Sequence, residues 1–320
     1  MTQANLREDY LSQDQDSLTR FLLPHAGVRG VRVHLDASWQ HIIERAGSNL
    51  DDPLQSTVIR LLGEASAASA LFTGHAKIDG RLSIQLRGDG PLRTLFAECT
   101  AAGTLRGIAQ VDEDATSESQ LENVHANPLQ ALGANAILAI TIEAEMIEGR
   151  EPTRYQGIVA LETDSLAGAF EGYFRQSEQL PTRLLLAADS ARTAGLMLQK
   201  LPGDVGDDDG WNRAMALFET LSPQELLDWP TDLLLARLFH EESAQVLDVR
   251  RLTFGCSCTR ERVASMLHSL GQEEAEAAAA EGMAEIRCEF CGQHYHFDAD
   301  QIAGIFQPEV ADVATTIRLQ

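Results

Sequence analysis

The chain has 320 residues, of which 44% are apolar and 23% charged, as in ordinary soluble globular proteins. It carries 48 Asp and Glu against 25 Lys and Arg, and the net charge of -23 disfavours nucleic acid and anionic membranes as partners. No apolar run reaches the ~18 residues of a membrane span, and the polar N-terminus lacks a signal-peptide pattern. We therefore expect a cytoplasmic protein whose five cysteines are reduced.

The first part of the chain predicts an α+β core, because helical periodicity gives way to alternation of apolar and polar residues. In chain order the predicted elements are helices over 36–72, strands from 74 to 99 around a hairpin turn at 88–91, an acidic loop at 112–122, strands at 137–142 and 157–161, a helix over 163–179 and a strand at 184–188. Such a segment has enough apolar residues to form its own core.

A Gly/Asp-rich joint at 202–210 separates this core from a series of short helices. The joint is interpreted as a solvated loop, with a calcium site as the alternative. Helices are predicted from Trp211, from the capping box that starts at Ser222, and after Pro230. Helices this short are marginal in water, so we expect them to dock on the apolar surface of the core.

The last module is small and poor in apolar residues. Thr259 is placed to cap a helix that ends at Gly271, an Ala/Glu run follows at 272–281, and a hairpin is predicted around 286–297. A unit of this size usually needs a metal or disulfides for stability.

Cysteine positions carry most of the functional information. Cys99 stands alone in an alternating strand pattern, which is typical of a buried, inert thiol. Cys256, Cys258, Cys288 and Cys291 form two close pairs, and four thiolates in a reducing compartment fit one zinc ion per chain. Such a closed site can be purely structural. Each pair can also close into a disulfide, so the alternative is a redox switch in which oxidation expels the metal.

Other chemistry has little support. The chain holds no phosphate-binding loop, dinucleotide-binding glycine motif, nucleophile elbow or H-E-x-x-H motif, and an enzyme with Cys99 as nucleophile lacks an evident base. The segment 87–93, with two glycines between two arginines, is an alternative anion site, although a tight turn is favoured. His240, beside two glutamates, could be part of a metal site but is interpreted as a helix end with an acidic face. His294 and His296 could compete for zinc but are interpreted as surface or hairpin residues, because four cysteines already complete a tetrahedron.

Seven stretches of the chain together resemble a known family. The two cysteine motifs read FGCSCTRERV at 254–263 and EIRCEFCG at 285–292, and the other stretches lie at 88–93, 155–159, 173–183, 216–221 and 237–242. In this order they resemble the bacterial redox-regulated holdase chaperones, the heat-shock protein 33 family. The resemblance covers essentially the whole chain, and its cysteine motifs are its most specific part.

The resemblance implies an ATP-independent stress-response chaperone that is not an enzyme. Its zinc ligands and redox-active disulfides carry over to Cys256, Cys258, Cys288 and Cys291. It implies unfolded or aggregation-prone proteins as partners, hand-over to ATP-dependent chaperones, and dimerisation of the oxidised form. The expected organisation is a client-binding α+β core at 1–190, a redox-sensitive helical linker at 191–245 and a zinc-binding switch domain at 246–320. The alternative is a constitutive zinc-ribbon interaction module whose metal is purely structural.

Overall fold

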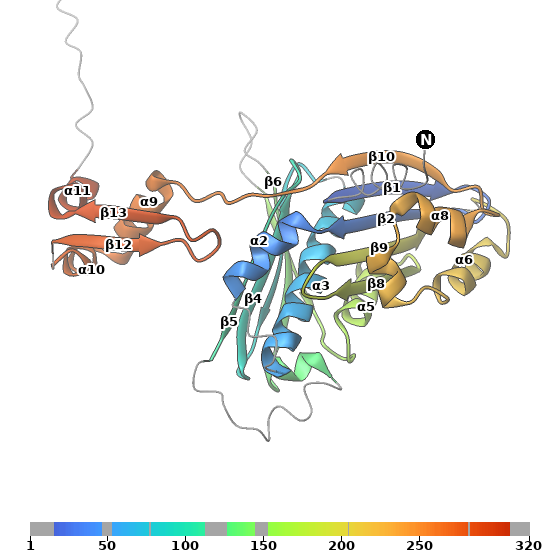
Figure 1. Cartoon of the computed structure of the whole chain (residues 1–320), viewed down its shortest axis with the longest axis horizontal. Coiled ribbons are helices and arrows are strands. Elements are labelled where there is room, and N and C mark those ends of the chain that lie inside the picture. The colour runs from blue at the N-terminus through green and yellow to red at the C-terminus, as the bar shows by residue number, and fades with distance from the viewer. Residues whose placement is uncertain are drawn as a thin grey trace, which may run out of the picture. The chain divides into compact units, whose positions relative to one another are not determined.

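The computed structural model of the chain describes residues 16–46, 53–76, 78–112, 127–144, 153–203, 205–280 and 282–307. The chain divides into two compact units, Met1–Cys256 and Ser257–Gln320 (Figure 1). Each unit has its own apolar core. Within the described ranges no helix combines the length and apolar character needed to cross a bilayer.

The first unit contains a five-stranded antiparallel sheet, here called sheet A, with the strand order β10-β1-β2-β9-β8 (Figure 1). Its strands are β1 (Ser17–Leu23), β2 (Val28–Leu35), β8 (Thr182–Ala188), β9 (Thr193–Lys200) and β10 (Gln245–Arg251). β1 pairs with its sequence neighbour β2 on one side and with β10 on the other. The segment that leads to the cysteine pairs is therefore hydrogen-bonded to the first strand of the core.

A second sheet of the same unit, sheet B, has the order β11-β5-β4-β3-β6-β7. Its strands are β3 (Gly80–Arg87), β4 (Leu92–Thr100), β5 (Thr104–Val111), β6 (Ile137–Ala144), β7 (Arg154–Val159) and the two-residue β11 (Thr253–Phe254). Alternate residues of β3, Leu82, Ile84 and Leu86, are buried on the inner face, as period-two alternation predicts. β11 joins β5 in parallel and is the last part of the chain before the first cysteine pair.

Helix α3 (Pro53–Ala76) packs against strands of both sheets and forms the centre of the main core (Figure 1). It is apolar on most of its circumference, which is typical of a helix buried on all sides. Its Gly63 allows the close approach of sheet A, because an added Cβ would lie 2.4 Å from the Cβ of Ala188. Helices α2 (Ala37–Ala46) and α5 (Leu166–Ser177) and the 3-10 turn η1 (Pro128–Leu132) complete this part of the unit.

Three short helices cover the face of sheet A that α3 does not. They are α6 (Gly210–Phe218), α7 (Pro223–Asp228) and α8 (Thr231–Phe239), and we call them the linker helices. Their apolar side chains share a separate core with sheet A, which includes Phe21, Leu23 and Val28 from the strands and Phe218 and Phe239 from the helices. The expectation that the short helices dock on the core is confirmed.

The second unit is a small α+β module. It comprises α9 (Arg260–Leu270), α10 (Gln272–Ala278), β12 (Met283–Arg287), β13 (His294–Asp298) and α11 (Ala299–Ile305), with β12 and β13 paired as a hairpin. The buried apolar residues among those described here are Val263, Leu267, Ala275, Ala279, Ala284, Phe297 and Ile302. Three of the seven are alanines, so little apolar surface holds this module together.

The structure confirms the mixed α and β class and most predicted elements. The capping box at Ser222 and the caps at Thr259 and Gly271 are present as expected. β1, β2, β9 and β10 were not predicted. The predicted acidic loop at 112–122 lies outside the described residues beyond Asp112, as does Asp204 of the Gly/Asp-rich joint.

The sequence predicts functional boundaries at 190/191 and 245/246, whereas the division into compact units lies at neither position. β9 extends the core sheet to Lys200, because it pairs with both β2 and β8. β10 and β11 then pair with core strands, so the division falls later, between Cys256 and Ser257.

Candidate metal and redox centre

Short connections place the four paired cysteines. Cys256 follows β11 by two residues, and Cys258 stands directly before Thr259, whose side chain caps the N-terminus of α9. Cys288 follows β12, and Cys291 lies in the turn that leads to β13. The two motifs are thus held by a cap on one side and a hairpin on the other.

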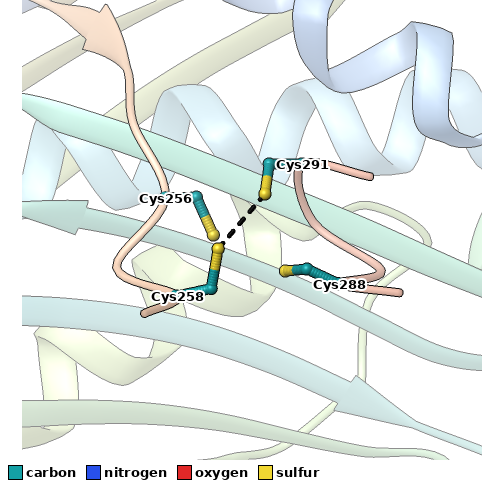
Figure 2. Close-up of side chains that lie close together, drawn as sticks. All are labelled: Cys256, Cys258, Cys288 and Cys291. Atoms are coloured by element: carbon teal, nitrogen blue, oxygen red, sulfur yellow. Dashed lines mark hydrogen bonds between the residues drawn. The ribbon is translucent and has the colours of Figure 1, made fainter. Parts of the chain in front are cut away.

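The turn of the hairpin depends on Gly292, whose φ of 71° lies in the left-handed region that favours glycine. The amide of Gly292 donates to the carbonyl oxygen of Cys288 at 2.7 Å, and the amide of Cys288 donates to that of Gln293 at 2.8 Å. These bonds fold the C-x-x-C motif back on itself, and Figure 2 shows the side chains of Cys288 and Cys291 directed toward the other pair.

The four sulfur atoms lie within 4.8 Å of one another (Figure 2). The Sγ atoms of Cys258 and Cys291 are 3.3 Å apart. A tetrahedral ion with Zn–S bonds of about 2.3 Å would hold its sulfur ligands roughly 3.8 Å apart, so the cluster fits such an ion. Four soft donors without an oxygen ligand favour zinc over calcium or magnesium. The residues predicted as ligands are therefore together in one group that can hold a metal.

Tyr295 of β13 adds a hydrogen-bond donor to this centre. Its hydroxyl donates to the sulfur of Cys258, and this bond, together with burial and the other nearby sulfurs, raises the pKa of Tyr295 to about 12. A donor of this kind orients a metal ligand and stabilises its negative charge. The sequence assigns Tyr295 only to an alternating strand, because a strand tyrosine at a metal site has the same local pattern as one in a core.

Three histidines that could in principle bind a metal lie outside the sulfur cluster. His294 has its Nδ1 2.6 Å from Oε1 of Glu285 on the neighbouring strand, and its ring stacks with that of His296 at 6.4 Å between centroids. The side chain of His240 is 67% exposed, and its Nε2 is 3.7 Å from Oε1 of Glu241. None of the three belongs to the sulfur cluster.

Cys99 lies in the main core with 1% of its surface exposed. Burial raises the pKa of its thiol to about 12, against the weaker opposite effect of a hydrogen bond from Thr73. The side chain is therefore a protonated thiol at neutral pH, and a thiol is a poor nucleophile compared with a thiolate. The prediction of a buried thiol is confirmed.

The linker helices are also held by a buried arginine of sheet A. Arg32 is 1% exposed, and its guanidinium donates to the hydroxyl of Thr231 and to the carbonyl oxygens of Trp229 and Leu226. The sequence pattern of a strand predicts that an arginine faces solvent. The structure instead buries it under helices that lie almost 200 positions later in the chain.

Two alternative sites from the sequence have simple structural explanations. At 88–91 the amides of Gly88 and Gly90 donate to the carbonyls of Arg93 and Leu132 at 3.0 and 2.9 Å, so this segment is a tight turn. In the Gly/Asp-rich joint the Asp207 carboxylate binds Arg213 at 2.8 Å, and this bond holds the pKa of Asp207 below its usual value.

The chain is similar to known proteins over most of its length. A family model described as Hsp33 protein matches residues 16–298. The 33 kDa chaperonin of Ectopseudomonas mendocina (strain ymp) is 42% identical over 299 residues, which cover 91% of this chain and 95% of that protein. The 33 kDa chaperonin of Nitrosococcus oceani is 39% identical over 306 residues, or 95% of this chain and 99% of that protein.

A solved structure shares the fold. The crystal structure of the 33 kDa chaperonin (heat shock protein 33 homolog) from Thermotoga maritima matches with a TM-score of 0.71. The match covers 91% of this chain and 97% of that one, at 20% sequence identity.

Proposed function

Because the chain belongs to the Hsp33 protein family, we propose that it is a redox-regulated, ATP-independent chaperone that holds unfolding proteins once its cysteine centre is oxidised. The observation that carries the proposal is the group of four sulfur atoms within 4.8 Å of one another. In the chain, β10 and β11 lie between this group and the linker helices, which cover an apolar sheet face. We expect a change at the sulfurs to reach that buried surface through these two strands.

In the reduced form we expect Cys256, Cys258, Cys288 and Cys291 to hold one zinc ion per chain. When bound, the ion cross-links the two cysteine motifs, and structural zinc contributes on the order of 10–16 kcal/mol of apparent binding free energy. The second unit has a small core rich in alanine, so its folding would depend on this cross-link.

Oxidation would close one disulfide between Cys256 and Cys258 and another between Cys288 and Cys291. Each disulfide forms when two thiolates give two electrons to one molecule of hydrogen peroxide, which takes up two protons and leaves as two molecules of water. The resulting sulfur atoms are neutral and no longer serve as ligands. The small unit would then lose the cross-link that stabilises it.

We assign client binding to the surface beneath the linker helices. These helices have nine, six and nine residues, and helices of this length are unstable alone in water. Their release would uncover apolar residues of sheet A, namely Phe21, Leu23, Val28, Leu196 and Leu198. A contiguous apolar surface of this kind binds unfolded chains. The net charge of -23 would help to keep the opened protein in solution.

The proposal includes the functional segments 1–190, 191–245 and 246–320 as core, linker and switch domain. β9 lies within segment 191–245 but is a strand of sheet A. β10 lies between the linker helices and the cysteine centre in the chain. Hand-over of clients to ATP-dependent chaperones, dimerisation of the oxidised form, a cytoplasmic location and the absence of enzymatic activity belong to the same proposal.

Light scattering from a thermally unfolding client protein tests the proposal, with zinc content measured on the same samples. Oxidised, zinc-free protein should suppress aggregation, reduced protein should not, and added ATP should change neither result. A Cys256→Ser/Cys288→Ser variant, which can close neither pair and keeps only two of the four zinc ligands, should show the same activity with and without oxidant, whereas Cys99→Ser should keep the oxidative response. Equal protection by the reduced and oxidised wild-type protein would instead identify a constitutive zinc-ribbon interaction module.

A further inference from the structure

The first cysteine of the centre is attached to sheet B by the strand that precedes it. β11 pairs in parallel with β5, with Thr253 opposite Thr104 and Phe254 opposite Leu105. The amide of Gly255 continues the ladder by donating to the carbonyl of Leu105 at 2.9 Å. Continued by one residue, this register places Gly255 opposite Arg106 of β5, and Cys256 follows directly.

Arg106 is fixed in place by an ion pair across the sheet. Its Nε donates to Oε1 of Glu98 on β4 at 2.9 Å, and the side chains are 14% and 7% exposed. Glu98 is also 3.9 Å from Nε of Arg81 on β3, so one buried carboxylate lies between two arginines. A guanidinium held in this way can make a directed hydrogen bond with its remaining N–H groups.

The sulfur of Cys256 accepts a hydrogen bond from the side chain of Arg106. Burial acts to lower the pKa of this guanidinium, but Glu98 and the Cys256 sulfur together raise it above its usual value. We propose that Arg106 is a positioning residue of the cysteine centre, which holds the Cys256 thiolate by a charged hydrogen bond and couples the oxidation of this sulfur to the pairing of β11 with β5.

The coupling follows from the change of charge at sulfur. A thiolate is a strong acceptor for a guanidinium, whereas a disulfide sulfur is neutral and a weak one. Oxidation of Cys256 would therefore weaken the hydrogen bond between Arg106 and the Cys256 sulfur. This bond lies next to β11, a strand only two residues long, so its loss would weaken the pairing of β11 with β5. This inference rests on the proposed redox function and adds a residue of the core to the machinery of that site.

Arg106→Gln tests the role of the hydrogen bond, and Arg81→Gln is the matched control. Both changes remove one arginine that pairs with Glu98 on the same sheet, but of the two only Arg106 donates a hydrogen bond to the Cys256 sulfur. Because Arg106→Gln weakens the neutralisation of a buried carboxylate, the double variant Glu98→Gln/Arg106→Gln provides a second test if the single one folds poorly. Arg106→Lys serves as the conservative variant.

Three measurements on the reduced full-length chain give the expected results. Competition with a chromophoric chelator should show zinc affinity reduced about tenfold in Arg106→Gln, as expected for loss of a residue that supports a metal ligand. With cobalt(II) in place of zinc, the sulfur-to-cobalt charge-transfer band should move to lower energy, because the sulfur loses a hydrogen bond. The amides of Thr253 and Gly255 should exchange faster with solvent. Arg81→Gln should leave all three unchanged, and Arg106→Lys should restore part of each.

The wild-type chain and the Arg106 variants give different results if Arg106 does not support the metal centre than if the chain is not redox-regulated. If the wild-type chain binds zinc and responds to oxidation, but Arg106→Gln and the double variant retain wild-type zinc affinity and the wild-type cobalt band, Arg106 has only a structural role in the sheet and the inference is wrong. If the wild-type chain itself binds no zinc or fails to respond to oxidation, the proposed function is wrong.

Discussion

Nε2 of His34 on β2 donates a hydrogen bond to the carbonyl oxygen of Leu227 at the end of α7, at 2.9 Å. A carbonyl oxygen only accepts, so this nitrogen carries the proton. With the neighbouring Arg32, His34 forms a polar attachment between sheet A and the linker helices beside their shared apolar core. Such bonds have strict geometric requirements, so they fix the position of the helices more sharply than apolar packing does.

Arg32→Ala should loosen the linker helices in the reduced protein. The change removes hydrogen bonds to the partly buried acceptors of Thr231 and Trp229, which corresponds to about 2–4 kcal/mol of docking free energy. We expect faster amide exchange at 223–239 and partial chaperone activity without oxidant. Arg29→Ala is the control, since Arg29 lies on the same strand and binds Gln199 instead. Unchanged exchange at these helices would contradict the assigned role of Arg32.

Cys256→Ser/Cys258→Ser should abolish stoichiometric zinc binding, because two ligands cannot replace a tetrahedral set of four. Cys99→Ser is the matched control, and it should bind zinc and respond to peroxide as the wild type does. Elemental analysis of the purified reduced proteins measures the difference. Stoichiometric zinc in the double variant would exclude the proposed ligand set.

Oxidation should unfold the second unit and release the linker helices while the main core stays folded. The reason is the unequal size of the cores, since the main core surrounds α3 between two sheets and the second unit has only a small cluster. Limited proteolysis should shift to the joint near 203–210 and leave a resistant fragment of roughly 200 residues, a typical size for one domain. Linker helices that stay equally protected in both states would refute release as the mechanism of activation.

Glu64→Gln should stabilise the protein at alkaline pH but not at acidic pH. Burial in α3 raises the pKa of Glu64 from 4.5 to about 7, against a weaker opposite effect of Arg60. Below pH 4.5 both the folded and unfolded states bind the proton, so there is no penalty. As the pH rises to 7 the unfolded state loses its proton first, and the stability of the wild type falls by up to about 3 kcal/mol.

Urea unfolding of the zinc-bound protein at pH 5 and pH 8 measures this difference. Glu64 keeps part of its surface accessible, so the value above is an upper limit. Glu44→Gln is the control, since that side chain is 63% exposed. A stability gain for Glu64→Gln that is equal at both pH values would show that the gain does not come from the titration of this carboxyl.

The sequence was sufficient for features that depend on local patterns. The capping box at Ser222 and the alternation of Leu82, Ile84 and Leu86 both appear in the structure as expected. The four paired cysteines also lie together. This grouping could be predicted, because two close cysteine pairs indicate a metal site or disulfides.

What could not be predicted depends on contacts between distant parts of the chain. β9 contains Gly195, which looks unfavourable in a strand, but an added Cβ there would lie 2.7 Å from a side-chain atom of Leu71 in α3. The burial of Arg32 could not be predicted for the same reason, since the helices that bury it are far away in sequence. The donors Arg106 and Tyr295 become visible only when the strands that carry them are placed beside the cysteines.

The strand order of sheet A also has a consequence for synthesis of the chain. β1 and β2 are translated first, but β2 cannot pair with its second partner β9 until the segment that begins at Thr193 has been translated. At ~5–20 residues per second, roughly 8–30 s separate translation of Leu35 from that of Thr193. During this interval β2 has an open edge, which is a site of aggregation in nascent chains. The growing polypeptide thus passes through the condition from which its mature form is proposed to protect other proteins.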